Sequence, residues 1–387
     1  MQRSEHRILT THAGSLPRPT ELTQLYDARA RGVEIDEHRL KELGSTATHE
    51  IVAAQAQVGV DVGNNGEQQR EGFFLYVQHR MSGFGGGWDR FPLADVSRYP
   101  MFAQSRQAQM DGKVAVSNFR PPKAVEEVRY QDTSLLNEEC ATFESALEAS
   151  AVPFVEPFMT APSPGIVCAA MKNEHYDTFD NYLSAVANAL SIEYEAIAAR
   201  GYVLQLDCPD LALERHMTYQ DAPVGEFVDF VDRVVETLNT SLKNVPREQV
   251  RLHVCWGNYE GPHDCDVPLE DILPSLLRAD VGALVLPFAN PRHAHEYRLL
   301  ERIPLAEDQL LIAGVIDTLT NFVEHPEVVA DRLRRIAAVL GDPSRLLAGT
   351  DCGFDTSAGM GRVSEDIVWA KLAAMTEGAK IASADLF

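Results

Sequence analysis

The chain has 387 residues, of which 45% are hydrophobic, so it can bury a large core and does not have the composition of a disordered protein. Its 57 acidic and 34 basic residues give a net charge of −23 at pH 7. A surface this acidic argues against nucleic acids and anionic membranes as partners.

The amino-terminal sequence MQRSEHRILTTHAGSLPRP lacks the apolar stretch of a secretory signal, and no run approaches the roughly 18 apolar residues of a membrane helix. We therefore expect a cytoplasmic protein. The six cysteines are scattered along the chain, which favours free thiols or metal ligands over a disulfide framework.

Short apolar runs alternate with longer helical patterns through most of the chain. Strands are predicted at 58–63, 113–119, 152–158, 202–208, 250–256, 281–288, 309–316 and 344–351. Helices, in which apolar positions recur every three and four residues, are predicted at 176–200, 224–243, 268–279, 326–341 and 363–383.

This alternation predicts a mainly parallel sheet, and eight units favour an α/β fold of the (β/α)8 TIM barrel type over a doubly wound sheet. We predict one catalytic domain over residues 1–387, with 1–50 as an N-terminal extension of loop and helices. Residues 64–111 are irregular and rich in glycine and aromatic residues, which indicates a loop insertion over the pocket. Chemistry in such barrels lies at the carboxyl ends of the strands.

The segment HAGSLPRP (12–19) follows a short β-like run and is the first candidate for function. The backbone N–H groups of Gly14 and Ser15 are available to bind a carboxylate or a similar anion. The alternative is an ordinary turn before a helix, capped by Ser15.

Carboxylates follow several predicted strands. Glu67 comes after a glycine-containing turn and Asp207 ends the run LQLD, so the two are candidates for binding an ammonium group or for acid–base work. Helix capping or pairing with an arginine is the alternative for either. Asp317, in GVID, is a further catalytic candidate, and Asp351, in GTDC, is placed to orient a neighbouring ligand.

The candidate metal ligands are His253 and Cys255 in RLHVCWGN and Cys352 in LLAGTDCGF. A histidine and a cysteine two positions apart on a strand point to the same face, and a barrel would bring Cys352 to them. Two thiolates and an imidazole around an open fourth position are typical of catalytic zinc. Simple burial of the cysteines in the core is the alternative.

Two other groups have the spacing of metal half-sites in a weaker context. His293 and His295, in ANPRHAHEY, are expected on a solvated loop or helix start. His263 and Cys265, in GPHDCD, are at most reserve ligands.

Seven motifs span residues 10 to 354: THAGSLPRP, DVGNNGE, LQLDCPD, HVCWGN, FANPRH, GVIDTLTNFVEHPE and AGTDCGF. In this order they resemble the catalytic barrel of the cobalamin-independent methionine synthase family, in its short, single-barrel form. The resemblance implies a zinc ion that binds a substrate thiol and lowers its pKa. It implies His253, Cys255 and Cys352 as the ligands of that Zn2+ ion.

The resemblance also assigns the binding of an amino acid substrate. Gly14 and Ser15 match the loop that holds the carboxylate of the amino acid. Glu67 and Asp207 match the residues that hold its ammonium group.

Two departures from the family's pattern bear on the reaction. The synthases have a glutamate as a further zinc ligand where this chain has Pro287, and Glu260 or Cys265 are the candidates to replace it. The synthases also carry a histidine after the aspartate of GVID, where this chain has Thr318 and Leu319, and they have an extra N-terminal barrel that helps bind folate.

We therefore predict a zinc-dependent alkyl- or methyltransferase that activates a small, homocysteine-like thiol, and not a folate-dependent methionine synthase. A relative of the family, epoxyalkane:coenzyme M transferase, uses the same chemistry on another electrophile. The expected partners are the thiol and an alkyl donor, and a homodimer is a further expectation. The alternatives are a barrel enzyme with a lost metal site and lyase or hydrolase chemistry, and a non-catalytic binder of amino acids or thiols.

Overall fold

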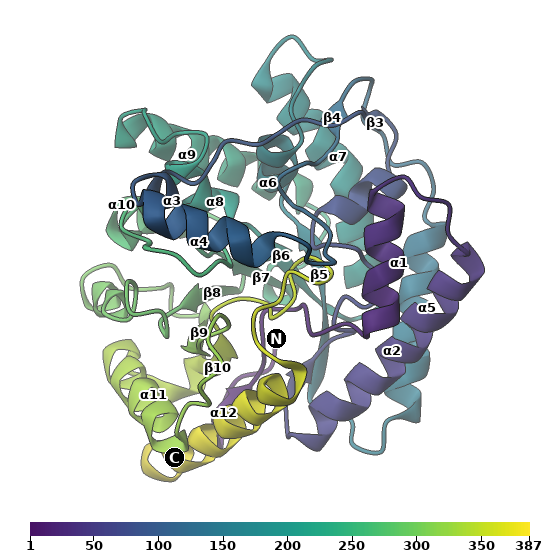
Figure 1. The fold of residues 1–387 in the computed structure, drawn as a ribbon. Coiled ribbons are helices and arrows are strands. Elements are labelled where there is room, and N and C mark those ends of the chain that lie inside the picture. Colours follow the sequence, from purple (N-terminus) through teal and green to yellow (C-terminus); the bar gives the residue numbers. More distant parts are fainter.

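The computed structural model describes all residues, 1–387, as a barrel of parallel strands surrounded by helices (Figure 1). Eight strands pair in the order β1-β10-β9-β8-β7-β6-β5-β2, and a parallel bridge between Thr11 and Val62 joins the two ends of that order. The predicted (β/α)8 barrel is confirmed. The strands are β1 (Leu9–Thr10), β2 (Val62–Gly63), β5 (Glu156–Pro162), β6 (Val203–Asp207), β7 (Val250–His253), β8 (Ala283–Pro287), β9 (Leu310–Ile316) and β10 (Leu346–Thr350).

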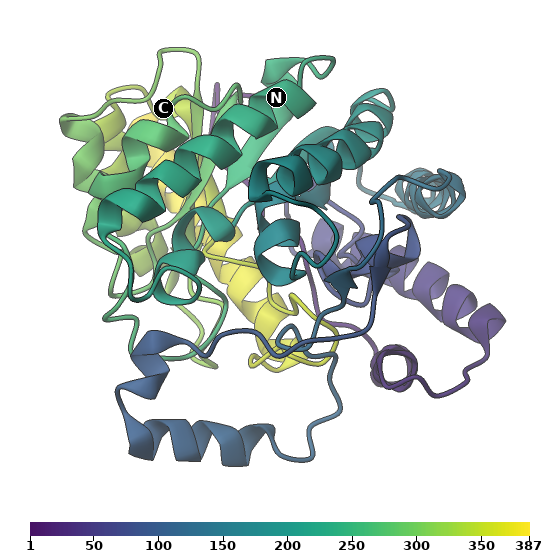
Figure 2. The same ribbon diagram turned by 90° about the horizontal axis from the view of Figure 1, so that it is seen from above.

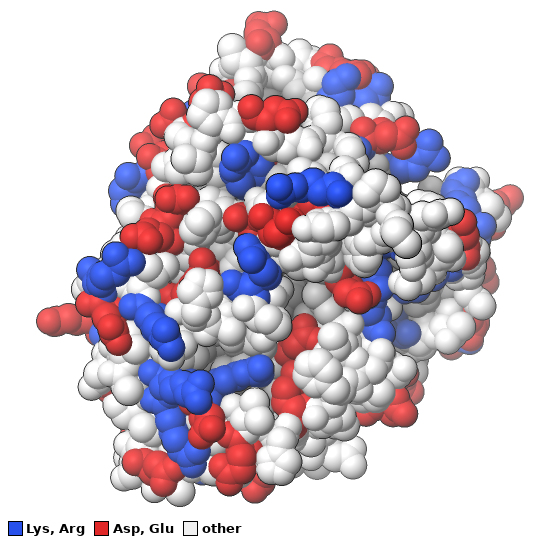
Figure 3. Space-filling model, turned by 60° about the vertical axis from the view of Figure 1, so that its left-hand side comes forward, with Lys and Arg blue, Asp and Glu red and all other residues white.

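Helices cover the outside of the barrel, and none combines the length and hydropathy that crossing a membrane requires. The α-helices are α1 (Thr20–Ala30), α2 (Glu37–Gln57), α3 (Ala94–Ser97), α4 (Pro100–Met110), α5 (Ser134–Ala149), α6 (Pro164–Ala170), α7 (Phe179–Ala198), α8 (Asp210–Leu213), α9 (Val224–Ser241), α10 (Leu269–Leu276), α11 (Pro326–Leu340) and α12 (Glu365–Leu386). Short 3-10 helices are η1 (Leu75–His79), η2 (Glu214–His216), η3 (Arg247–Gln249), η4 (Glu296–Glu301) and η5 (Pro343–Arg345). On the face drawn in Figure 3, acidic and basic side chains are interspersed.

One predicted strand is absent and two are displaced: β2 occupies only the last two residues of 58–63, and β5 begins at Glu156 and runs past the predicted 152–158 to Pro162. Residues 113–119 pair with no strand; instead, Val116 N–H donates a 2.9 Å hydrogen bond to the carbonyl of Ala358 in a loop. Val114 is 44% exposed, so the apolar alternation there does not mark a buried face. The eighth strand of the barrel is β1, a two-residue segment just before HAGSLPRP.

Alternate positions of each strand point into the barrel, and their character changes along its axis. Small apolar clusters pack where the strands begin: Leu9, Ala283, Val285, Leu310, Ile312 and Leu347 in one, and Val62, Phe158 and Val203 in the other. Nearer the carboxyl ends of β6 and β7 the corresponding positions are polar and buried: Gln205, Asp207, Arg251 and His253. The functional candidates therefore extend the polar layer of the barrel interior.

The connection between β2 and β5 reaches well beyond the barrel. It contains an antiparallel pair, β3 (Phe84–Gly85) with β4 (Lys123–Ala124), and the helices α3 and α4. Figure 1 shows α4 in front of the barrel, and Figure 2 shows the same helix standing off the barrel on one side. Leu93, Arg106 and Met110 from this connection line the pocket described next.

Candidate metal and substrate site

The main pocket lies at the carboxyl ends of the strands, and half of its 26 lining residues are hydrophobic. His253 ends β7, Asp207 ends β6, and Cys352 lies two residues beyond β10. Six residues predicted from the sequence line this pocket together: Ser15, Glu67, Asp207, His253, Cys255 and Cys352.

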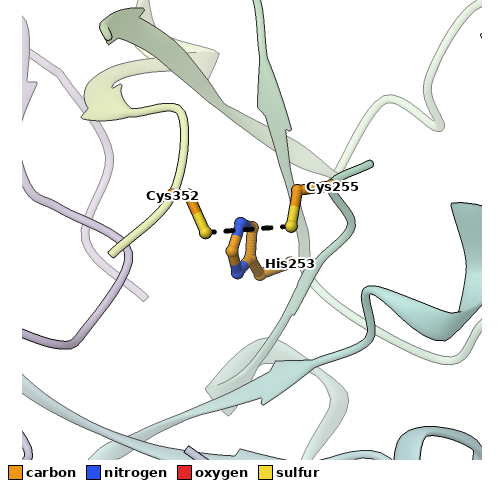
Figure 4. A group of neighbouring side chains, drawn as sticks. All are labelled: His253, Cys255 and Cys352. Carbon is orange, nitrogen blue, oxygen red and sulfur yellow. Dashed lines mark hydrogen bonds between the residues drawn. The ribbon is translucent and has the colours of Figure 1, made fainter. Parts of the chain in front are cut away.

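The side chains of His253, Cys255 and Cys352 converge, with one ligand atom from each lying within 4.8 Å of the others (Figure 4). The two sulfur atoms are 3.8 Å apart. Two Zn–S bonds of about 2.3 Å at a tetrahedral angle place their sulfurs about 3.8 Å apart, so the donor set fits zinc. All three residues are buried, as expected for a metal site closed on one side.

A chain of hydrogen bonds inside the barrel orients His253. Its Nδ1 lies 2.9 Å from Asp207 Oδ1, and that oxygen also accepts a 2.7 Å bond from Gln205 Nε2. Arg251 Nε donates to Gln205 Oε1 at 2.8 Å and so fixes the direction of the amide. Because Asp207 engages Nδ1, Nε2 is the nitrogen of His253 that is left for a metal, and it lies 3.4 Å from the carbonyl oxygen of Asp351.

The two thiols differ in pKa because they share one hydrogen bond. That bond and the nearby His253 hold the pKa of Cys255 well below its usual value, although burial raises it. The same bond, together with burial, raises the pKa of Cys352. Burial lowers the pKa of His253, but the Cys255 thiolate and Asp207 outweigh it and raise that pKa to about 10. Without a metal the site thus stabilises a thiolate beside an imidazolium, and a bound metal ion would take the place of the imidazolium proton, because a histidine ligand is neutral.

Only three protein ligands belong to the cluster. Pro287 ends β8 and lines a small cavity together with Cys255 and Cys352, but its ring offers no donor atom. The position matched to the glutamate ligand of the synthases therefore does lie beside the candidate metal. Three protein ligands would leave one position of a tetrahedral metal ion open, as in catalytic zinc sites.

Neither residue suggested as a replacement ligand joins the cluster. Glu260 forms a 3.0 Å ion pair with Arg362, and its side chain is 56% exposed. The Sγ atom of Cys265 accepts a 3.1 Å hydrogen bond from Arg98. Both side chains are engaged by arginines away from the three ligands.

Glu67, in the loop after β2, is a buried carboxylate in a strained backbone conformation. It is 1% exposed, and its backbone φ of 58° is in the left-handed region. Thr160 Oγ1 donates a 2.9 Å hydrogen bond to Oε1, while Oε2 is buried without any partner. Burial, and next the charge of Asp207, raise the pKa of Glu67 to about 7. An unpaired carboxylate oxygen of this kind is suited to an ammonium group from a ligand.

The loop after β1 presents one free amide to the pocket rather than two. Gly14 N–H donates to His12 Nδ1 at 3.2 Å, whereas Ser15 N–H makes no hydrogen bond within the chain. Gly14 has φ of 121°, and a Cβ there would lie 2.7 Å from Glu67 Oε1, so only glycine fits. Ser15 is therefore the residue of this loop that is available to an anion.

The two remaining carboxylate candidates serve the loops around the site. Asp351 accepts backbone hydrogen bonds from Ala289 (2.9 Å) and Asn290 (2.6 Å), and so holds the loop after β8. Asp317 Oδ2 accepts a 2.9 Å bond from Thr320 N and closes a turn. Asp317 lines the small cavity beside Pro287 and does not line the main pocket.

The histidines expected on a solvated loop do not share one environment. His295 is exposed, but His293 is 4% exposed and hydrogen-bonds Asp266 and Glu296, each at 2.8 Å. His263 also contacts Asp266, at 2.9 Å. The prediction was thus wrong for His293. His263 and His293 thus share the carboxylate of Asp266, and neither belongs to the group of candidate metal ligands.

Sequence reasoning missed two sets of residues in and below the pocket. Gln205 and Arg251 carried a usable signal, since each is a polar residue two positions before a candidate in an apolar strand. Arg90, Arg106 and Arg362 line the pocket from segments outside the barrel, where no periodic pattern marks them.

No family model matches the chain. Among curated proteins, the methionine synthases of Saccharolobus solfataricus and Thermococcus kodakarensis are each 24% identical to it over 97% of its length, and the matches cover 95% and 94% of those proteins. A solved B12-independent methionine synthase from Shewanella sp., in complex with selenomethionine, has a TM-score of 0.73 at 19% identity, covering 98% of this chain and 99% of that one. A putative vitamin-B12 independent methionine synthase from Listeria monocytogenes has a TM-score of 0.65 at 18% identity, covering 96% and 98%. The resemblance predicted from the motifs is confirmed: the chain is related over almost its whole length to methionine synthases and shares the fold of the B12-independent enzymes.

Proposed function

We propose that the protein is a zinc-dependent methyl- or alkyltransferase that activates a small, homocysteine-like thiol for attack on an electrophilic carbon. The observation that carries the proposal is the convergence of two thiols and an oriented imidazole in a pocket with an open coordination position. The names of the relatives, all methionine synthases, support transfer of a methyl group to a thiol as the class of reaction.

Zinc held by His253, Cys255 and Cys352 would lower the pKa of a substrate thiol, so that a thiolate is present at neutral pH. The rest of the mechanism belongs to the chain. Asp207 keeps His253 in place through Oδ1, and its Oδ2 accepts no hydrogen bond within the chain. That oxygen and the unpaired Oε2 of Glu67 hold the ammonium group of the thiol substrate.

Ser15 completes the binding of the amino acid end, because its N–H and hydroxyl are free to donate to the carboxylate. With the ammonium and carboxylate groups of the amino acid both bound, the sulfur is held at the cluster and its attack on the donor is intramolecular in effect. The new S–C bond forms as the bond between the alkyl group and its donor breaks. The apolar lining of the pocket excludes water from the thiolate.

Metal analysis tests the proposal most directly. We expect about one zinc per chain in the purified protein, and loss of zinc and of turnover in C255S and C352S. C265S is the matched control, because Cys265 is partly exposed and lies outside the cluster. Undiminished thiol alkylation after a chelator has removed all metal would show that the proposal is wrong.

A further inference from the structure

Three guanidinium groups line the pocket, all from segments that cover the barrel rather than from its strands. Arg90 precedes α3, Arg106 lies on α4, and Arg362 precedes α12. Two of them have carboxylate partners: Arg90 pairs with Glu214, and Arg362 pairs with Glu260 at 3.0 Å.

Arg106 has no carboxylate partner. Its Nε is buried without a hydrogen bond, and its guanidinium lies 5.4 Å from the centre of the Tyr259 ring. Burial, and next the charge of Arg362, lower the pKa of Arg106, so the two cations are near enough to repel each other. Two guanidinium groups that line one pocket, of which only Arg362 pairs with a carboxylate, the exposed Glu260, favour an additional anion.

The nearby carboxylate of Asp95 does not fill this role. It accepts hydrogen bonds from Tyr259 Oη (2.6 Å), His263 N (2.9 Å) and Val96 N (2.7 Å). These three donors satisfy the carboxylate, which therefore leaves Arg106 without a strong hydrogen bond.

The same pocket has an apolar lining that suits a non-polar part of a ligand. Its hydrophobic side chains include Phe73, Leu93, Met110, Phe119, Met217 and Met360. A ligand that satisfies both features has an apolar body and an anionic end. The amino acid thiol does not need these arginines, because Ser15, Glu67 and Asp207 already match its two charged ends.

We propose that Arg106, together with Arg362, binds a carboxylate, sulfonate or phosphate group on the alkyl donor, whose apolar part lies along the hydrophobic lining. The inference rests on the proposed function only in calling this molecule the donor. Guanidinium groups recognise such anions by paired, charge-assisted hydrogen bonds.

Binding of two nearly isosteric probes tests the anion subsite without turnover. Benzenesulfonate carries the apolar ring and the anion, and methyl phenyl sulfone has nearly the same shape without the charge or a nitrogen that could bind zinc. Calorimetric titration of the purified protein should give a dissociation constant for the sulfonate lower by on the order of tenfold. R106Q should remove this preference. R120Q should keep it, because Arg120 pairs with Asp89 and both side chains are more than 70% exposed.

Equal affinity for the two probes, or an unchanged preference in R106Q, overturns the inference. If R106Q does not fold, R362Q gives the same comparison with the other guanidinium removed, and retention of the preference there counts against the subsite. The result is separate from the metal analysis. If the protein contains zinc but shows no preference for the sulfonate, the proposed function is supported and the anion subsite is overturned. If it prefers the sulfonate but contains no zinc, the subsite is supported and the proposed function is overturned.

Discussion

At the scale of single residues, the buried Glu67 carboxylate has a free oxygen that a ligand can pair with. The residue is buried, its backbone is in the left-handed region, and one carboxylate oxygen has no partner. Such a combination is costly in the free protein and is typical of groups retained for function. An ammonium group from the substrate would relieve it by pairing with the free oxygen.

A comparison of homocysteine with 4-mercaptobutyrate, which is the same thiol without the amino group, isolates this interaction. The wild-type protein should bind homocysteine more tightly by on the order of tenfold, because only homocysteine brings a cation to Glu67. E67Q should lose much of this preference, and the part that remains is due to Asp207 Oδ2, the other oxygen proposed to bind the ammonium group. If E67Q keeps the full preference in a competition assay, the ammonium group binds elsewhere.

The raised pKa of Glu67 also predicts how stability depends on pH. Its folded pKa is about 7 and its unfolded value is 4.5, so its contribution to stability is full below pH 4.5 and is lost as pH rises through 7. Glutamine does not ionise and avoids this loss. E67Q should match the wild type near pH 4.5 and exceed it at pH 8 by up to about 3 kcal/mol in urea unfolding. A constant difference across this pH range would mean that Glu67 does not titrate there.

At the scale of elements, the strands that carry the site were predictable because each is a long apolar run. β6 to β10 fall inside the runs predicted for them, and the period of two placed His253 and Cys255 on one side. β1 could not be ranked as a strand, because two residues carry no periodicity. The run at 113–119 has the alternation but lacks a neighbouring strand, and pairing is not visible in a single segment.

The loop between β1 and α1 also depends on a feature that the sequence only suggests. Gly14 permits a positive φ and a close approach to Glu67, and both are needed for the substrate end of the pocket. The pattern HAGSLPRP indicated a loop that binds anions. It did not show that His12 takes the Gly14 amide and leaves Ser15 as the free donor.

Alanine substitutions at two glycines separate backbone conformation from close packing. Gly14 and Gly32 both have positive φ, but a Cβ at Gly32 would meet nothing within 4 Å. G32A should therefore lose about 1 kcal/mol of unfolding free energy, from conformation alone. G14A should lose a further 1–3 kcal/mol, roughly, through the clash with Glu67 and Thr160, and should also weaken homocysteine binding. Equal losses in the two variants would show that the loop relaxes around the added methyl group.

At the scale of the whole molecule, hydrogen bonds inside the barrel connect distant strands to the candidate metal site. Arg251 on β7 reaches across to the segment that follows β1, where it donates to Thr11 Oγ1 (3.1 Å) and to the carbonyl of His12 (3.0 Å). It also donates to Gln205, which in turn holds Asp207. The same buried cation thus ties β7 to the segment after β1 across the barrel interior and supports the residues that orient His253. The sequence shows the arginine but not the partners, because these come from distant segments.

A second buried cation provides the contrast that tests this link. Lys371 on α12 pairs with Glu324 at 2.8 Å, and both side chains are at most 2% exposed. Since that pair lies outside the chain of hydrogen bonds to His253, K371M should cost about 3–5 kcal/mol of stability through the unpaired Glu324 and leave zinc affinity unchanged. R251M should also destabilise the fold, by about 1–3 kcal/mol for each carbonyl, amide or hydroxyl oxygen left unsatisfied. Unlike K371M, it should lower zinc affinity by roughly tenfold in a chelator competition, because Asp207 is no longer held. If R251M loses stability but binds zinc as tightly as K371M does, Asp207 holds His253 without help from the barrel interior.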